Sequence, residues 1–276
     1  MNGRELKAKL KSGQPVFGMM LSSADGMRWD RMLASVPLDY VVIDSEHGSR
    51  DRTTIAALVV MCRAAGIVSV LRVPAPDPTM VAIALDTGVE GVLTPYCEDI
   101  QQIKECAWKV RVHPLKGKAF QDIVDHGKFP SEKARTYLES RHSNNFYIVG
   151  VESITAVNKL DEILNCAPLD GVFVGPNDMT TSLGIPDELD NPAYIDALKT
   201  VIAKSEAKGL PVMIHHQNMK TSTMSLELGA RFVLHGSDAG LLRQIVTSNF
   251  TALRETAAKK WGGAGATKVS DKMEAV

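Results

Sequence analysis

The sequence predicts a single (β/α)8 barrel, the TIM-barrel architecture of the α/β class, over a chain of 276 residues. Eight short runs are apolar and rich in β-branched residues, which is typical of strands that are buried on both faces. Amphipathic stretches of helical length separate these runs, and this alternation predicts parallel strands joined by crossover helices. Eight such units in roughly 250 residues match the usual size of the barrel. The expected strands are 16–21, 40–44, 68–73, 91–96, 146–152, 171–175, 210–215 and 231–236.

The segments between these runs carry the start and stop signals of helices. Asp77-Pro78 and Asn191-Pro192 each combine a capping side chain with a proline suited to the first helical turn. A doubly wound open sheet would show the same alternation, but its first strand usually leads into a glycine-rich phosphate loop. Residues 19–27, MMLSSADGM, contain no such loop, so the barrel is favoured. Four of the amphipathic stretches close on a glycine, the residue that most often ends a helix: Gly66, Gly88, Gly209 and Gly229.

Residues 112–145 interrupt the alternation, because they are polar, rich in turn residues and longer than an ordinary connection. A long loop inside a compact domain is usually functional, and we expect this one to leave strand four at the mouth of the barrel as a lid or an oligomer contact. No second domain is expected. The barrel takes residues 1–261, and the small, polar and charged residues 262–276 are expected to form a disordered tail.

The composition argues against several classes of partner. A net charge of -1, a pI near 6.7 and an aromatic content of 5% do not favour a nucleic acid or an anionic membrane surface. The longest apolar stretch, residues 55–71, is broken by Arg63, whereas a membrane-spanning helix needs about 20 apolar residues. The N-terminus has no apolar run of a secretory signal. The four cysteines show no CxxC pairing, so we expect neither disulfides nor a zinc ribbon, and a cytoplasmic location.

Two carboxylates follow neighbouring strands and suggest a cation site. In this barrel the carboxyl ends of all strands meet at one mouth, and Glu152 and Asp178 come at the ends of strands five and six, one repeat apart. Mg²⁺ or Mn²⁺ often takes only one or two protein carboxylates and leaves positions open for substrate and water. Each residue could instead cap the helix that follows it. Considered together with the other strand ends, the pair favours the metal site.

Three further residues suggest acid–base and anion chemistry at the same mouth. Arg72 ends an apolar strand, so its planar fork either faces a carboxylate or enolate oxygen of a substrate or forms a structural ion pair with Asp44 or Glu46. His47 is suited to general acid–base catalysis or to an ordinary loop hydrogen bond. Asp86, late in a helix, either faces solvent or orients His47.

Two other chemistries are disfavoured at this mouth. No expected strand ends in lysine, so Schiff-base catalysis is disfavoured. His215, His216 and His235 fit no zinc motif, and we expect them to line the mouth or lie in the core.

These strand ends resemble the HpcH/HpaI family of metal-dependent class II pyruvate aldolases, which cleave 4-hydroxy-2-oxo acids on a barrel of the phosphoenolpyruvate/pyruvate type. The likeness runs from about residue 16 to residue 253, and the combination of D-x-E-H-G with G-P-x-D is its most specific part. The motifs are Asp44-Ser45-Glu46-His47-Gly48, Leu71-Arg72-Val73-Pro74, Leu85-Asp86-Thr87-Gly88, Glu152, and Gly175-Pro176-Asn177-Asp178-Met179.

The resemblance implies a role for each matching residue. Glu152 and Asp178 would ligate a divalent cation, Mg²⁺, Mn²⁺ or Co²⁺. Arg72 would stabilise the pyruvate enolate, and the backbone amides of Asn177 and Asp178 would hold the substrate carboxylate. The remaining roles would fall to His47 and Asp86 as an acid–base dyad and to Asp44 and Glu46 as supporting residues. The family also suggests a homo-oligomer, such as a hexamer, in which the last helix packs against a neighbour.

The chain departs from the family pattern at two places. Gly150 stands where many members carry a glutamine that touches pyruvate, and residues 113–120, HPLKGKAF, lack the usual RGxG half of the loop after strand four. The second substrate is therefore open, with Phe120, Gln121, Asp122 and His126 as candidates to line its pocket.

Other functions on the same barrel also stay open. One is a citrate-lyase-like or malyl-CoA-lyase-like enzyme, against which the near-neutral charge argues mildly. Another is an oxaloacetate decarboxylase, which needs the same cation and enolate. The third is a non-catalytic binding barrel.

Overall fold

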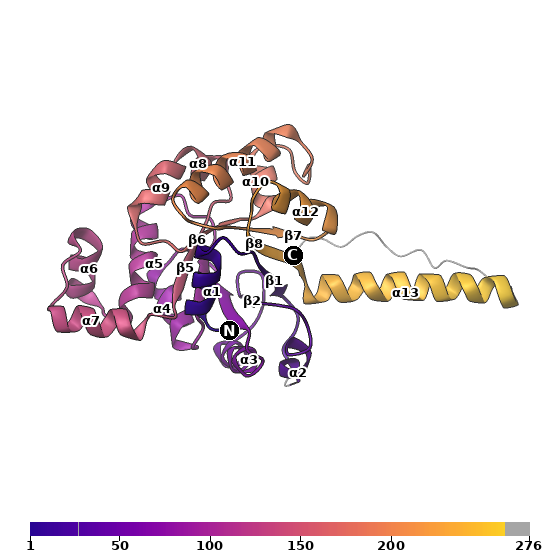
Figure 1. The fold of residues 1–276 in the computed structure, drawn as a ribbon, viewed down its shortest axis with the longest axis horizontal. Coiled ribbons are helices and arrows are strands. Elements are labelled where there is room, and N and C mark those ends of the chain that lie inside the picture. The colour runs from indigo at the N-terminus through magenta and orange to yellow at the C-terminus, as the bar shows by residue number, and fades with distance from the viewer. Residues whose placement is uncertain (27, 263–276) are drawn as a thin grey trace.

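The computed structural model describes residues 1–26 and 28–262 and has the predicted closed barrel of eight parallel strands in the order β1 to β8 (Figure 1). All eight expected strands are confirmed, with ends that differ by at most two residues. The expected tail lies outside the described residues apart from Gly262. The strands are β1 Val16–Leu21, β2 Tyr40–Asp44, β3 Val68–Arg72, β4 Gly91–Thr94, β5 Phe146–Gly150, β6 Gly171–Val174, β7 Val212–His216 and β8 Phe232–Ser237.

The described residues form more helices than one per strand. An additional helix precedes β1, the β5–β6 and β6–β7 connections contain two helices each, and the β4–β5 connection contains three. Within the described part of the chain, no helix is both long and apolar enough to span a membrane. The helices are α1 Gly3–Lys11, α2 Trp29–Leu33, α3 Arg52–Ala64, α4 Pro78–Asp86, α5 Ile100–Val112, α6 Gly117–His126, α7 Glu132–Arg141, α8 Ile154–Asn158, α9 Leu160–Cys166, α10 Pro176–Ser182, α11 Pro192–Ala207, α12 Met219–Glu227 and α13 Asp238–Trp261.

The predicted helix boundaries follow from local chemistry. The Asp77 side chain accepts a hydrogen bond from the Thr79 amide at the start of α4, and Asn191 does the same for Ala193 at the start of α11. These contacts satisfy amides that have no partner within the helix. The four predicted glycine stops all have positive φ angles, between 71° at Gly209 and 102° at Gly229, as expected of a residue without a Cβ atom.

Two hydrophobic layers hold the barrel together. One lies between the strands and the surrounding helices, and the other fills the barrel interior. Leu6 and Leu10 of α1 belong to the interior layer, so this first helix covers the end of the barrel at which the strands begin. The opposite end, where the strands finish, holds the polar residues of the site.

The predicted loop at residues 112–145 is instead a helical pair, α6 and α7, and it lies away from the mouth. The chain has already returned along α5 from the end of β4 to the entry side of β5, which runs parallel to β4. The pair projects from the barrel wall with its own small core, which includes Phe120 and Leu138 (Figure 1). Phe120, Gln121, Asp122 and His126, the candidates to line the pocket of the second substrate, therefore do not lie at the mouth of their own barrel.

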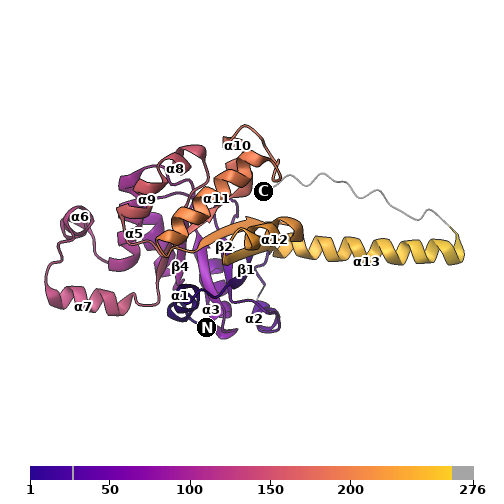
Figure 2. The same cartoon turned by 45° about the horizontal axis from the view of Figure 1, so that its top comes forward.

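The last helix, α13, extends away from the barrel as a single rod in both views (Figures 1 and 2). None of its residues is buried. Phe17, on the outer side of β1, is correspondingly 42% exposed. The large exposed apolar side chains of α13 are Leu242, Ile245, Val246, Phe250, Leu253 and Trp261.

Replacing Gly18 with alanine is expected to lower the free energy of unfolding by about 1–3 kcal/mol, the usual result of overpacking a core. A Cβ atom at this position would lie 2.5 Å from the ring of Tyr40. That ring is fully buried, packs edge to face on Phe232 at 4.7 Å and donates a hydrogen bond to the Val233 carbonyl at 2.7 Å, so it has little room to move. Urea denaturation measures the change.

The control for Gly18→Ala is Gly26→Ala. A Cβ atom at residue 26 would meet nothing closer than 3.8 Å. Equal stabilities of the two variants would contradict the packing argument.

Candidate active site

A buried ion pair joins the ends of β2 and β3 at the mouth. Asp44 and Arg72 are register partners, and the guanidinium donates Nε to Asp44 Oδ1 at 2.9 Å and Nη2 to Oδ2 at 2.8 Å. Burial alone would raise the pKa of Asp44, but the hydrogen bonds and charge of Arg72 outweigh it and hold that pKa below its usual value. The structural ion pair considered from the sequence is therefore present, and it fixes the guanidinium in place.

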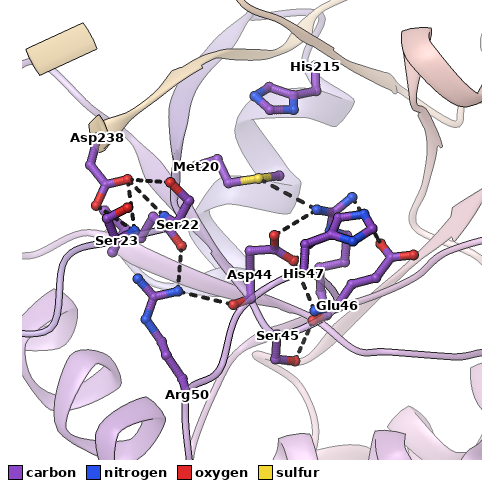
Figure 3. A network of polar contacts seen from close by, with 12 residues as sticks. Met20, Ser22, Ser23, Asp44, Ser45, Glu46, His47, Arg50, His215 and Asp238 are labelled. Carbon is purple, nitrogen blue, oxygen red and sulfur yellow. Dashed lines mark hydrogen bonds and ion pairs between the residues drawn. The ribbon is translucent and has the colours of Figure 1, made fainter. Parts of the chain in front are cut away.

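Glu46 connects this pair to His47. Its Oε2 lies 3.0 Å from Arg72 Nη1, without the alignment of a hydrogen bond, and 3.8 Å from His47 Nε2. Burial raises the pKa of Glu46, although the positive charges of Arg72 and His47 oppose the increase. The His47 side chain is 44% exposed, so it can reach a bound molecule (Figure 3).

Two further residues tie the first loops of the mouth together. Arg50 donates to the carbonyls of Leu21, Asp44 and Ala24 at 3.1 Å each, which joins the turns after β1 and β2. Asp238, after β8, accepts hydrogen bonds from Ser22 and from the Ala24 amide (Figure 3). Neither residue was among the predicted site residues, although the position of Asp238 directly after β8 was a usable signal.

Asp86 does not meet His47 within one chain. Helix α4 carries the chain from the end of β3 back to the start of β4, so its last residue lies at the opposite end of the barrel. There Asp86, with a side chain 71% exposed, lies 2.8 Å from His113 Nε2. The dyad expected from the resemblance is therefore not formed inside the described part of this chain.

The predicted carboxylate pair does come together. Glu152 follows β5, Asp178 lies in the first turn of α10, and a Cβ atom built on Gly175 would sit 2.3 Å from Glu152 Oε1 and 3.0 Å from Asp178 Oδ2. Gly175 therefore leaves open the space that both oxygens face. Neither carboxylate caps a helix, because Ser153 caps α8 and the N-cap of α10 is Gly175, which makes no side-chain bond.

The buried carboxylate of Glu152 lacks a full set of partners. The residue is 1% exposed, its Oε2 accepts a hydrogen bond from the Tyr96 amide at 2.8 Å, and its Oε1 is buried without a partner. Burial raises the pKa of Glu152 to about 8, and the negative charges of Asp178 and Glu46 add to the increase. Two carboxylates that offer hard oxygen donors and lack a bonded positive group suit a divalent cation. Among the described residues no group of three or more His, Cys, Asp or Glu forms a metal cluster, so these two are the candidate ligands.

Tyr96 was not singled out in the sequence. Its phenol donates a hydrogen bond to Asp178 Oδ1 and its amide donates to Glu152 Oε2, so this residue contacts both carboxylates, and it is 48% exposed. Its position at the end of the expected strand 91–96 was a usable signal, because strand ends meet at the mouth. A Cβ atom at Gly150 would lie 2.6 Å from the Thr94 carbonyl oxygen and so obstruct the turn that carries Tyr96.

The histidines of β7 and β8 bond to protein groups. His215 Nε2 lies 3.1 Å from the Gly236 carbonyl, His216 bonds to Ser225, and His235 bonds to Ser222. Burial lowers the pKa of His215 and of His216 to about 4, so both rings are neutral at pH 7. His215 faces the mouth beside Met20 (Figure 3), whereas His216 is buried.

The raised pKa of Glu152 predicts how stability depends on pH in protein freed of divalent cations. Between about pH 4.5 and 8 the folded protein keeps a proton that the unfolded chain has released, so the free energy of unfolding falls as pH rises. Glu152→Gln should remove up to about 1.4 kcal/mol per pH unit of this slope and make the variant the more stable protein at pH 8. Urea denaturation with a chelator from pH 5 to 8 measures this. Glu139→Gln, on exposed α7, is the control, and an unchanged slope in Glu152→Gln would contradict the assignment.

Comparison with known proteins agrees with this geometry. Residues 19–244 match the family model of the HpcH/HpaI aldolase/citrate lyase family. The 5-keto-4-deoxy-D-glucarate aldolase of Klebsiella pneumoniae subsp. pneumoniae is 28% identical over 87% of this chain and 92% of its own length. The hydroxypyruvate/pyruvate aldolase of Agrobacterium fabrum is 27% identical over 93% of each chain.

Among solved structures, an HpcH/HpaI aldolase from Desulfitobacterium hafniense matches with a TM-score of 0.78 and 26% identity, over 91% of this chain and 96% of that one. The family model covers well over half of the chain, and the relatives are aldolases and lyases. The chain therefore belongs to the HpcH/HpaI aldolase/citrate lyase family and is an enzyme of the aldolase and lyase type.

Proposed function

We propose that the protein is a metal-dependent class II aldolase that cleaves a 4-hydroxy-2-oxo acid into pyruvate and an aldehyde. The observation that carries the proposal is the unpartnered, buried Glu152 Oε1, which faces the same space as Asp178 Oδ2 close to the fixed guanidinium of Arg72. A negative site open to a cation, next to a positive group, suits a substrate that passes through an enolate.

Glu152 and Asp178 would hold the cation, which we propose to be Mg²⁺, Mn²⁺ or Co²⁺, because hard carboxylate donors discriminate weakly among them. When bound, the cation would polarise the 2-oxo group and stabilise negative charge on its oxygen. The backbone amides of Asn177 and Asp178, in the first turn of α10, would donate to the substrate carboxylate.

Arg72 would stabilise the developing enolate. Asp44 and Glu46 hold its guanidinium from two sides, so little reorganisation is needed when charge appears on the substrate. Both carboxylates support the site by positioning Arg72, which remains cationic throughout.

His47 would move the protons of the reaction. As a base it would take the proton of the 4-hydroxyl group, the C3–C4 bond would break, and C4 would leave as the aldehyde. The electron pair of that bond would pass into the enolate of pyruvate, which takes up a proton at C3. Glu46, 3.8 Å from His47 Nε2, would stabilise the protonated imidazole. The dyad implied by the resemblance could arise only from Asp86 of another copy, because topology separates the two residues in one chain.

We also propose that the protein is a cytoplasmic homo-oligomer, and a hexamer would accord with the resemblance. A 24-residue helix with no buried residue leaves a row of apolar side chains in water, and a second copy could cover them.

Arg72→Lys is expected to lower kcat by about 10²–10³-fold, because a lysine keeps the charge beside Asp44 but loses the fork geometry. Arg72→Ala is the poorer test, since it would leave Asp44 and Glu46 buried without their cation and cost about 3–5 kcal/mol. Pyruvate release from 4-hydroxy-2-oxo acids measures the change.

The matched control is Arg63→Lys at the far end of the barrel, where Arg63 binds the Gly88 carbonyl. Full activity in Arg72→Lys would overturn the role of Arg72. Turnover of oxaloacetate or a CoA thioester, without aldehyde release from any hydroxy-oxo acid, would favour the decarboxylase or lyase alternatives. An absence of all three activities would favour a binding protein.

The double substitution Ile245→Glu/Phe250→Glu on α13 is expected to convert the oligomer to monomers at micromolar concentration, because it places charges in the proposed contact. Light scattering after size exclusion gives the mass. Ser248→Glu on the same exposed helix is the control. A monomeric unmodified protein, or a double variant with unchanged mass, would refute the proposed contact.

A further inference from the structure

Among the described residues, Tyr96 donates a hydrogen bond to each of the two carboxylates of the proposed cation site. The turn that carries Tyr96 follows β4, and it brings a backbone donor to Glu152 and a side-chain donor to Asp178. These contacts come from one residue, although the carboxylates belong to different strand ends. Tyr96 therefore couples the positions of the two groups.

The two donors divide the four carboxylate oxygens into two sets. The Tyr96 amide donates a hydrogen bond to Glu152 Oε2 at 2.8 Å, and the Tyr96 hydroxyl donates one to Asp178 Oδ1. The other two oxygens, Glu152 Oε1 and Asp178 Oδ2, are those nearest the space left open by Gly175. One oxygen of each carboxylate is thus held by Tyr96, and the other faces the opening.

The turn is held in this position by its surroundings. Tyr96 has a φ of 50°, in the left-handed region that a residue with a side chain rarely adopts, at a typical cost of about 1–3 kcal/mol. The Cys97 amide donates to the Gly150 carbonyl at 3.0 Å, and the Thr94 hydroxyl pairs with that of Tyr147 at 2.5 Å. A side chain at residue 150 would come within 3.0 Å of Pro95 Cα, so the turn needs a glycine there.

We infer that Tyr96 is a positioning residue that determines which oxygen of each carboxylate faces the cation. This inference rests on the proposed function, because it assigns a role only if Glu152 and Asp178 bind a metal. Without the phenol, the Asp178 carboxylate loses the hydrogen bond that sets its orientation. Metal binding must then fix that orientation, which weakens the binding. Hydrogen bonds to metal ligands typically change affinity by about 10–100-fold, so a loss in this range is expected.

Direct binding of Mn²⁺, measured by isothermal titration calorimetry on the full chain, tests the inference without relying on turnover. Tyr96→Phe removes only the hydroxyl group and should weaken Mn²⁺ binding by about tenfold or more. Tyr96→Gly also removes the ring, and it suits the positive φ, so its fold should be preserved. Circular dichroism verifies folding, and Tyr137→Phe, on the exposed face of α7, is the matched control.

Glu152→Gln and Asp178→Asn separate this inference from the proposed function. If both abolish Mn²⁺ binding and Tyr96→Phe weakens it while Tyr137→Phe does not, the inference is supported. If both abolish binding but Tyr96→Phe binds as tightly as the unmodified protein, the role of Tyr96 is overturned and the metal site stands. If binding survives in both carboxylate variants, the metal site is refuted and the role of Tyr96 falls with it.

Discussion

Burying negative charge at the barrel mouth is the constraint on which the rest of the site depends. Four carboxylates at the mouth interact electrostatically with one another or with the buried guanidinium of Arg72. They are those of Asp44, Glu46, Glu152 and Asp178. Arg72 is committed to Asp44 and Glu46, which leaves Glu152 and Asp178 without a positive partner. A buried carboxylate in such surroundings, as that of Glu152 is, either keeps a proton or binds a cation. A site of this kind is costly for folding, so it indicates a function.

The fold supplies this arrangement through topology. Parallel strands finish at one end of the barrel, so residues more than a hundred positions apart in the chain, such as Asp44 and Asp178, gather there. Small residues then make room between them. Gly175 leaves space for two carboxylate oxygens, and Gly150 leaves space for the turn that carries Tyr96. The barrel itself is stabilised by apolar packing inside and outside the sheet, which frees the mouth for polar groups.

The sequence was most informative where a pattern depends on local chemistry. Apolar runs and glycine stops located all eight strands, and residues at strand ends located Asp44, Arg72, Glu152 and Asp178. It failed where the direction of the chain matters. Asp86 ends the returning helix α4, and residues 113–145 follow the returning helix α5. Both therefore lie at the other end of the barrel from the residues with which they were grouped.

Two other features could not be predicted from the sequence. The contacts of Tyr96 depend on a positive φ, for which its side chain gives no signal. The projection of α13 depends on how little of this helix packs against its own barrel, since only its first turn, with Leu241, contacts the core, and an amphipathic pattern cannot reveal this.

The proposed reaction depends most directly on a cation between Glu152 and Asp178. A crystal of the protein grown with Mn²⁺ and pyruvate, with anomalous data collected near the manganese edge, tests for this cation. We expect one strong anomalous peak in contact with Glu152 Oε1 and Asp178 Oδ2, with pyruvate oxygens beside it. An empty space between these oxygens at saturating Mn²⁺, or a peak bound elsewhere in the barrel, would contradict it.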